Sequence, residues 1–75
     1  MNKERRKIIS DQISPIEQII SDLEAAKDEE QEYYDNMPES FQSGEKGEAA
    51  QRAIDALGTA CSNLEEAKSE IENIE

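Results

Sequence analysis

The sequence contains no histidine, one cysteine and three aromatic residues among its 75 positions. A single cysteine excludes a disulfide within the chain. Without histidine or a second thiol, the usual ligand sets of a structural zinc site are missing, as are the paired Glu-x-x-His ligands of a di-iron helical bundle. We therefore predict no metal and no cofactor. So short a chain is then stabilised by hydrophobic packing and by oligomerisation.

The chain also lacks a long hydrophobic run and has few basic residues. No apolar segment is long enough for a signal peptide or a membrane span, and a lone cysteine is typical of a cytosolic protein. Nineteen acidic and eight basic residues give a net charge of −11. Such a surface repels nucleic acid and anionic membranes. We therefore expect a cytoplasmic protein that binds neither directly.

Residues 50–74 carry the clearest pattern in the chain. Their apolar residues recur in steps of three and four, which places them on one face of a helix. They are Ala50, Ala53, Leu57, Ala60, Leu64, Ala67, Ile71 and Ile74. Large residues alternate with alanine, which lets a neighbouring helix approach closely and pack its own large residues over the alanines. A pattern this regular argues against disorder.

The N-terminal half carries a second heptad, which Pro15 interrupts. Its members are Ile9, Ile13, Ile16, Ile20 and Leu23. Ser14-Pro15-Ile16-Glu17 has the features of a helix start: a capping serine, proline at the first helical position and glutamate three residues after the cap. We predict a helix over 15–36. Residues 3–13 form either a short helix ahead of it or the same helix continued through a kink.

A connection over 36–44 separates this helix from a second long helix over 45–74. Pro38 disfavours the helical conformation at the residue before it, which ends the first helix near Asn36. Ser43 or Gly44 is the expected cap of the second. Two helices joined by so short a segment run antiparallel. The predicted fold is therefore all-α: a single domain, 1–75, built as an antiparallel two-helix hairpin with a short N-terminal helix or kinked extension.

An antiparallel hairpin brings definite residues opposite one another. We expect large residues to face small ones in the pairs Ala26/Leu57, Leu23/Ala60, Ile19/Leu64 and Ile16/Ala67. Glu30 falls on the apolar face and is expected to pair with Arg52. The basic residues Lys3, Arg5, Arg6 and Lys7 are expected beside Glu70, Glu72 and Glu75, where opposite charges at two helix ends offset one another.

The chain has more apolar residues than one stripe per helix requires. Ile8, Ile20, Ile54 and Cys61 widen the stripe beyond a single line of contact. We predict that these remaining faces pair in a symmetric homodimer, which forms a four-helix bundle.

Asp28, Glu32, Asp35 and Glu39 repeat at steps of four, three and four, and the first three form one acidic edge. Such an edge can imitate the phosphates of nucleic acid and occupy a basic groove on another protein. Two alternatives are a solvated face that keeps the protein soluble and a metal site. The segment from Asp28 to Glu39 lacks the glycine turn of a calcium loop.

All three aromatic residues gather at the same end of the hairpin. Tyrosine, methionine and phenylalanine surrounded by carboxylates are typical of a protein-binding surface. The alternative is a plug that seals the end of the bundle; we favour it for Tyr33 and Phe41 and expect Tyr34 to be the contact residue. The predicted partner-binding residues are Asp28, Glu32, Tyr34, Asp35, Asn36, Met37, Glu39 and Phe41.

The chain offers little for catalysis. It has serines but neither a histidine nor a suitably placed lysine to act as their base, and a slim hairpin has no cleft in which two carboxylates would differ in pKa. Cys61 lies beside the apolar stripe with no cationic neighbour expected, so we predict an unreactive, buried core residue. We predict no catalytic residues and no enzyme activity.

The run from Asp28 to Glu48, with the turn Asn36-Met37-Pro38-Glu39 and the alanine–leucine heptad after it, resembles small acidic helical-hairpin proteins of bacteriophages and prophages. The resemblance implies a phage accessory protein that acts in the bacterial cytoplasm by inhibiting a host nucleic-acid-handling or defence protein. Two other functions remain open: an oligomeric sponge for a small signalling nucleotide, and a purely structural helical assembly module.

Overall fold

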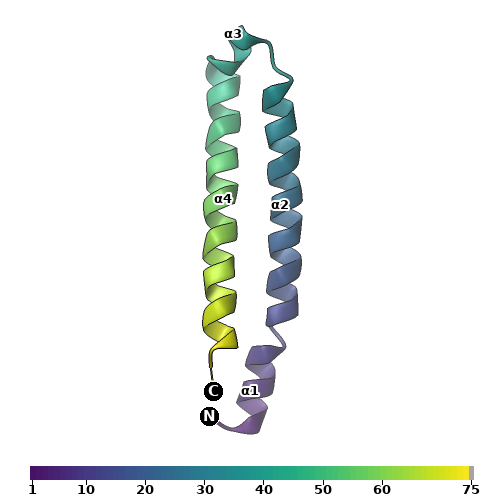
Figure 1. The fold of residues 1–75 in the computed structure, drawn as a ribbon, viewed down its shortest axis with the longest axis vertical. Helices are drawn as coiled ribbons and strands as arrows, with labels where there is room; N and C mark the ends of the chain where they lie inside the picture. The colour runs from purple at the N-terminus through teal and green to yellow at the C-terminus, as the bar shows by residue number, and fades with distance from the viewer. Residues whose placement is uncertain (75) are drawn as a thin grey trace.

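The computed structural model describes residues 1–74, which form α1 (Lys3–Ser10), α2 (Ile13–Asp35), α3 (Glu39–Gln42) and α4 (Glu45–Glu72). The long helices α2 and α4 lie side by side and antiparallel, α3 closes one end, and α1 extends from the other (Figure 1). The molecule measures 58 × 14 × 13 Å. The predicted all-α antiparallel hairpin is confirmed, and the described residues include no strand.

Pro15 explains the break between α1 and α2. The proline ring clashes with the carbonyl four residues earlier and cannot donate a hydrogen bond to it. The chain therefore turns at Asp11 and Gln12, whose N–H groups donate to the carbonyls of Lys7 and Ile9 at 2.9 and 3.1 Å. Pro15 is the third residue of α2, and Gln12 precedes the helix without a side-chain cap. The predicted cap at Ser14 is wrong, and α1 is a separate short helix.

The start of α4 follows the sequence closely. Gly44 occupies the cap position in an extended conformation, and Glu45 and Glu48 lie in the first turn, where the helix dipole favours them. The helix ends at Glu72, so Ile74 lies beyond it and is 45% exposed. Glu75, which was expected beside the basic residues of the N-terminus, lies outside the described residues.

The buried face of the hairpin is rotated from the one that the alanine–leucine heptad predicts. The most buried apolar residues are Ile20, Ala50, Ile54 and Cys61. Ala50 belongs to both faces. By contrast Ala67 and Ile74 are exposed, and the remaining heptad residues, Ala53, Leu57, Ala60, Leu64 and Ile71, are only half-buried. Turning Ile54 and Cys61 inward removes more apolar surface from water than turning alanines inward. Three of the four residues expected to be left over, Ile20, Ile54 and Cys61, therefore form the centre of the hairpin, whereas Ile8 is exposed.

The two helices are also shifted along one another relative to the prediction. Glu17 lies 3.6 Å from Lys68, measured from carboxylate oxygen to ammonium nitrogen, and the end of Lys27 lies against Gly58. Each contact is two residues farther along α4 than the expected pairs place it. Three of the four predicted large-over-small pairs are wrong, because each contains an exposed residue: Ala26, Ile19 or Ala67. In the fourth pair, Leu23 and Ala60 are both half-buried. The predicted Glu30–Arg52 pair is absent from the ion pairs of residues 1–74.

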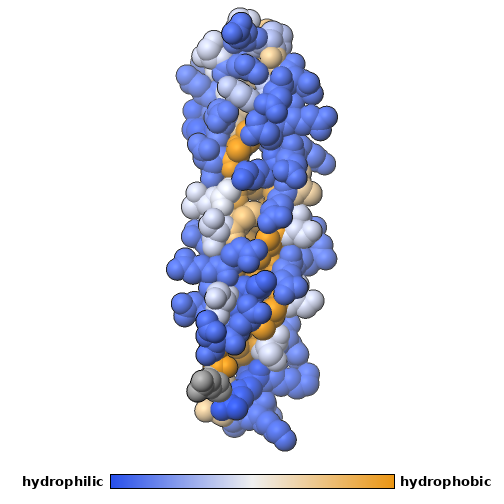
Figure 2. All heavy atoms as spheres, in the orientation of Figure 1, coloured by the Kyte–Doolittle hydropathy of each residue, from blue (hydrophilic) through white to orange (hydrophobic). Residues whose placement is uncertain are grey.

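The core of this hairpin is thin. Hydrophobic residues appear as a narrow strip between the two long helices, with hydrophilic residues on both sides (Figure 2). No large side chain among residues 1–74 is completely buried. Within the same residues, no helix combines the length and the hydrophobicity that crossing a membrane requires. Each buried isoleucine therefore carries an unusually large share of the packing.

Candidate functional site

The predicted partner-binding residues gather at the closed end of the hairpin. Asp28, Glu32 and Asp35 lie on the last turns of α2, and all three are exposed. Asn36 caps that helix, as predicted. Glu39 and Phe41 belong to α3 and are also exposed. We call residues 28–45 the acidic tip, because they include seven acidic residues and no basic one.

The short helix α3 fixes the shape of the acidic tip. Pro38 precedes it in an extended conformation, and its carbonyl accepts hydrogen bonds from the N–H groups of Phe41 and Gln42 at 2.8 and 3.1 Å. The Gln42 side chain then donates to the carbonyl of Tyr34 at 3.0 Å, which ties α3 to the last turn of α2. The segment predicted as a connection therefore contains a short helix that is tied to the end of α2.

Two residues that were not among the predicted partner-binding residues position this tip. Gln42 makes the bond to α2 just described, and Gly47 lets α3 lie against the first turn of α4. A side chain at Gly47 would overlap the backbone of Gln42. One signal in the sequence pointed to α3: proline followed by glutamate is typical of a first helical turn, and Pro38-Glu39 stands at its start.

The aromatic residues of the tip are arranged oppositely to the expectation. Tyr33 and Phe41, predicted to form a plug, are 51% and 53% exposed. Tyr34, predicted to face a partner, is half-buried, as is Met37. Tyr34 falls seven residues after Lys27 and fourteen after Ile20, so it follows the buried face of α2. The accessible aromatic surface of the tip therefore comes from Tyr33 and Phe41.

No carboxylate of the acidic tip takes part in an ion pair among residues 1–74. The ion pairs among residues 1–74 join Lys7 to Asp11 and join Lys68 to Glu17 and Glu65, all outside the tip. Within it, Asp35 accepts a hydrogen bond from the Gln31 amide at 2.9 Å. Because an unpaired carboxylate projects its charge into solvent, the tip is an electrostatically negative surface.

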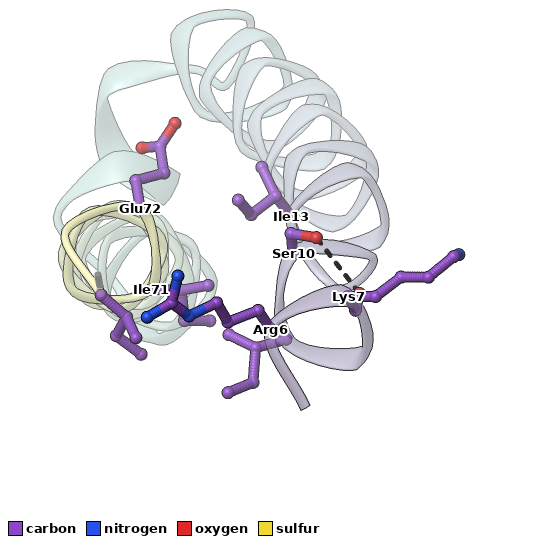
Figure 3. Close-up of a pocket in the computed structure, with 8 residues that line it drawn as sticks. Arg6, Lys7, Ser10, Ile13, Ile71 and Glu72 are labelled. Atoms are coloured by element: carbon purple, nitrogen blue, oxygen red, sulfur yellow. Dashed lines mark hydrogen bonds between the residues drawn. The ribbon is translucent and has the colours of Figure 1, made fainter. Parts of the chain in front are cut away.

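Basic residues concentrate at the opposite end of the molecule. Asn2 caps α1 by accepting a hydrogen bond from the Arg5 N–H at 2.8 Å, which holds the basic tract in a helix. Arg6 reaches toward α4 beside Ile71, while Lys7 points away from it (Figure 3). Arg6 and Glu72 line the same hollow of about 430 Å³. The expected proximity to Glu72 is present, but no ion pair joins the two residues.

The remaining candidate chemistry is sparse in the part of the chain that the structure describes. Cys61 is buried, as predicted, and is a free thiol. Across residues 1–74, no three histidine, cysteine, aspartate or glutamate side chains are grouped so that they could hold a metal ion. The acidic tip is thus the surface with the most distinctive chemistry.

The chain was compared with protein families, curated proteins and solved structures. No family model, no curated protein and no solved structure matches the chain.

Proposed function

We propose that this protein is a non-enzymatic binding protein whose acidic tip occupies a basic surface on another protein. The observation that carries the proposal is the absence of any cation within residues 28–45, while their seven carboxylates stay outside the ion pairs described above. Carboxylates left unpaired within the chain can pair with cations of another protein without first breaking a contact inside the chain.

The spacing of these carboxylates suits a surface that ordinarily binds nucleic acid. Asp28, Glu32 and Asp35 advance by about 6 and then 4.5 Å along α2, at roughly 1.5 Å per residue. Phosphates of a duplex advance by about 3.4 Å per residue along each strand, so the acidic edge carries roughly two-thirds of the linear charge density of one strand. In keeping with the phage resemblance, the fitting partner is a host protein with a basic groove, such as a nuclease.

The accessible aromatic residues add a second component to the same surface. Phe41 and Tyr33 are half-exposed beside the carboxylates. Aromatic side chains supply much of the affinity in protein interfaces, whereas surrounding charges guide the approach and select the partner. The acidic tip therefore combines a charged edge with apolar contact area at one end of a rigid hairpin.

Neutralising the acidic edge is expected to abolish most of this binding. In the variant D28N/E32Q/D35N/E39Q, four carboxylates become amides of nearly the same shape. Each exposed charge pair contributes about 0.5 kcal/mol, so affinity should fall about 30-fold. The measurement is recovery of basic proteins from a bacterial lysate at low and high salt, followed by titration of the recovered partner. Recovery should weaken as salt rises.

A matched control separates local charge from total charge. The variant D22N/E66Q/E70Q/E72Q removes four exposed carboxylates away from the tip, and none of them takes part in an ion pair. It should keep most of the partner affinity. Equal weakening by both variants would show that only net charge matters, and recovery of no basic, nucleic-acid-binding protein at either salt would contradict the proposal.

Shortening the tip distinguishes this function from a structural one. Replacing residues 36–43 with a short Gly-Ser turn removes α3 together with Glu39 and Phe41. A protein that acts through the tip should lose its partner, whereas a helical assembly module should retain its activity. Circular dichroism checks that α2 and α4 remain folded. If the helix content falls by more than the deleted residues account for, unfolding would explain the loss of partner binding.

A further inference from the structure

One side of the hairpin keeps apolar residues that the other side lacks. In α2, Ser21 follows the buried Ile20 and lines a groove with Glu65 and Lys68, so Ile19, which precedes Ile20, lies on the opposite side. In α4 the same holds around Cys61: Ser62 lines a groove with Lys27, and Ala60 lies opposite. The two sides of the hairpin are therefore chemically different.

We call the side opposite these grooves the Ile19 face. Its members follow one another at helical spacing on both long helices, and each is exposed or only half-buried. They are Ile16, Ile19 and Leu23 of α2 and Ala53, Leu57, Ala60 and Leu64 of α4. Ile19 is 47% exposed. None of the seven lines any of the polar grooves on the other side.

The exposed area of the molecule matches what one further copy would cover. The accessible surface is 5654 Å² for a chain of 8.4 kDa, whereas a compact monomer of that mass exposes about 4600 Å². The excess is roughly 1000 Å², and a stable protein–protein interface buries about 800 Å² on each partner. A second hairpin packed along the Ile19 face would therefore give each copy the burial typical of a compact domain.

The charges at the two ends determine how a second copy would be oriented. The acidic tip lies at one end of a 58 Å molecule, and Lys3, Arg5, Arg6 and Lys7 lie at the other. Of these four residues only Lys7 takes part in an ion pair among residues 1–74, and its partner is the nearby Asp11. Parallel copies would bring like charges together, whereas antiparallel copies bring each basic end beside the partner copy's acidic tip.

We propose that two copies of this chain pair antiparallel through the Ile19 face, so that the basic end of each lies beside the acidic tip of the other. Ala53 and Ala60 let the second hairpin approach closely, and Ile19, Leu23, Leu57 and Leu64 supply the apolar area. The result is a four-helix bundle with two-fold symmetry. The proposal goes beyond the binding function above and does not depend on it.

The first test is the mass of the full chain and two variants by sedimentation equilibrium. The unaltered protein is expected at twice 8.4 kDa. Ala60→Glu places a charge on the Ile19 face of each copy and should weaken association by at least about 100-fold, since an unpaired charge in an apolar interface is strongly disfavoured. Ser62→Glu is the matched control on the opposite side and should leave the dimer intact.

These outcomes decide the proposal as long as the variants are folded, which circular dichroism establishes. A monomeric unaltered protein at about 100 µM, a concentration far above the Kd of a stable dimer, would overturn it. So would a dimer that Ser62→Glu breaks and Ala60→Glu spares. Neither result involves a foreign partner, so a failure here is distinct from a failure of the proposed function.

The second test measures the orientation. Ser40 is exposed on α3, and a spin label at Ser40→Cys in a Cys61→Ala background reports the separation of the two tips. Antiparallel copies should give a distance close to the 58 Å length of the molecule, α1 included. A distance of only a few helix diameters, each about 10 Å, would mean parallel copies and would overturn the antiparallel arrangement. The charge reversal K3E/R5E/R6E should weaken the antiparallel dimer.

Discussion

Replacing Ile54 with alanine is expected to lower the free energy of unfolding by about 2–4 kcal/mol, since removing a buried branched side chain leaves a cavity in addition to the lost burial. Ile54 is 7% exposed and belongs to a core in which no large side chain is completely buried. A chain of this length has roughly 4–11 kcal/mol of stability in all. Such a loss should lower the Tm by about 10–20 °C.

Urea unfolding followed by far-UV circular dichroism measures this loss. Ile8→Ala is the matched control, because it is the same substitution at an isoleucine of α1 that is 62% exposed, and it should cost less than about 0.5 kcal/mol. Both variants are compared at several protein concentrations, since the stability of a dimer depends on concentration. Equal, small losses for the two variants would contradict the buried position of Ile54.

The Ile54 experiment also shows which of two possible faces of α4 is buried, because the sequence pattern is compatible with both. In the face predicted from the heptad, Ile54 and Cys61 lie beside the contact and Ala53 and Ala60 within it. In the structure their positions are exchanged. The predicted face advances by three and then four residues, whereas the observed face advances by four and then three. Both faces therefore include every seventh residue, which is why Leu57 and Leu64 belong to both. Periodicity alone therefore gives a helix and its stripe but not the side of the stripe that is buried.

The same ambiguity in α2 explains why Tyr34 is half-buried and Tyr33 is exposed, the reverse of the prediction. The buried line of that helix runs through Ile20, Lys27 and Tyr34, and the lysine in its middle hides the pattern from a search for apolar residues. Lys27 lies along this line because its end rests against Gly58, where no side chain obstructs it. Following the apolar residues alone leads instead to Ala26 and Tyr33, which are both exposed.

Features that depend on local chemistry were predicted more fully than those that depend on packing, with the cap at Ser14 as the exception. Gly44 at the start of α4 and Asn36 at the end of α2 occupy the predicted positions. The acidic edge is exposed as a solvated helix face requires. The helix α3 is only four residues long, which is too short for periodicity to reveal. Its position depends on close packing against Gly47, which belongs to the next helix.

Gly47→Ala and Gly58→Ala are expected to change stability in opposite directions, although both replace a glycine of α4 with the best helix former. Gly58→Ala should stabilise the protein by about 0.5–1 kcal/mol, the gain for alanine over glycine inside a helix. The new methyl group would lie 3.4 Å from the flexible end of Lys27, which can move aside. Urea unfolding of the two variants measures both effects.

At Gly47 the same gain is outweighed by a clash. A Cβ there would overlap the carbonyl of Gln42 and lie 2.6 Å from its Cα, and backbone atoms cannot move aside as a lysine end can. Overpacking of this kind costs about 1–3 kcal/mol, so Gly47→Ala should be destabilising despite its higher helix propensity. A stabilising Gly47→Ala would show that α3 does not pack against α4 as described.

The Gly47 substitution should act on the tip more than on the hairpin. The clash is relieved most easily if α3 moves, which breaks the bond from the Gln42 side chain to the Tyr34 carbonyl. Hydrogen exchange should then speed up at Gln42 and Ser43, whose N–H groups are bonded within α3, and change little along α2. Glu39 and Phe41 move with α3, so partner binding through the acidic tip should weaken in Gly47→Ala and persist in Gly58→Ala. If binding persists in both while α3 exchanges freely, the partner contacts α2 alone, and the contribution of Phe41 to the interface is excluded.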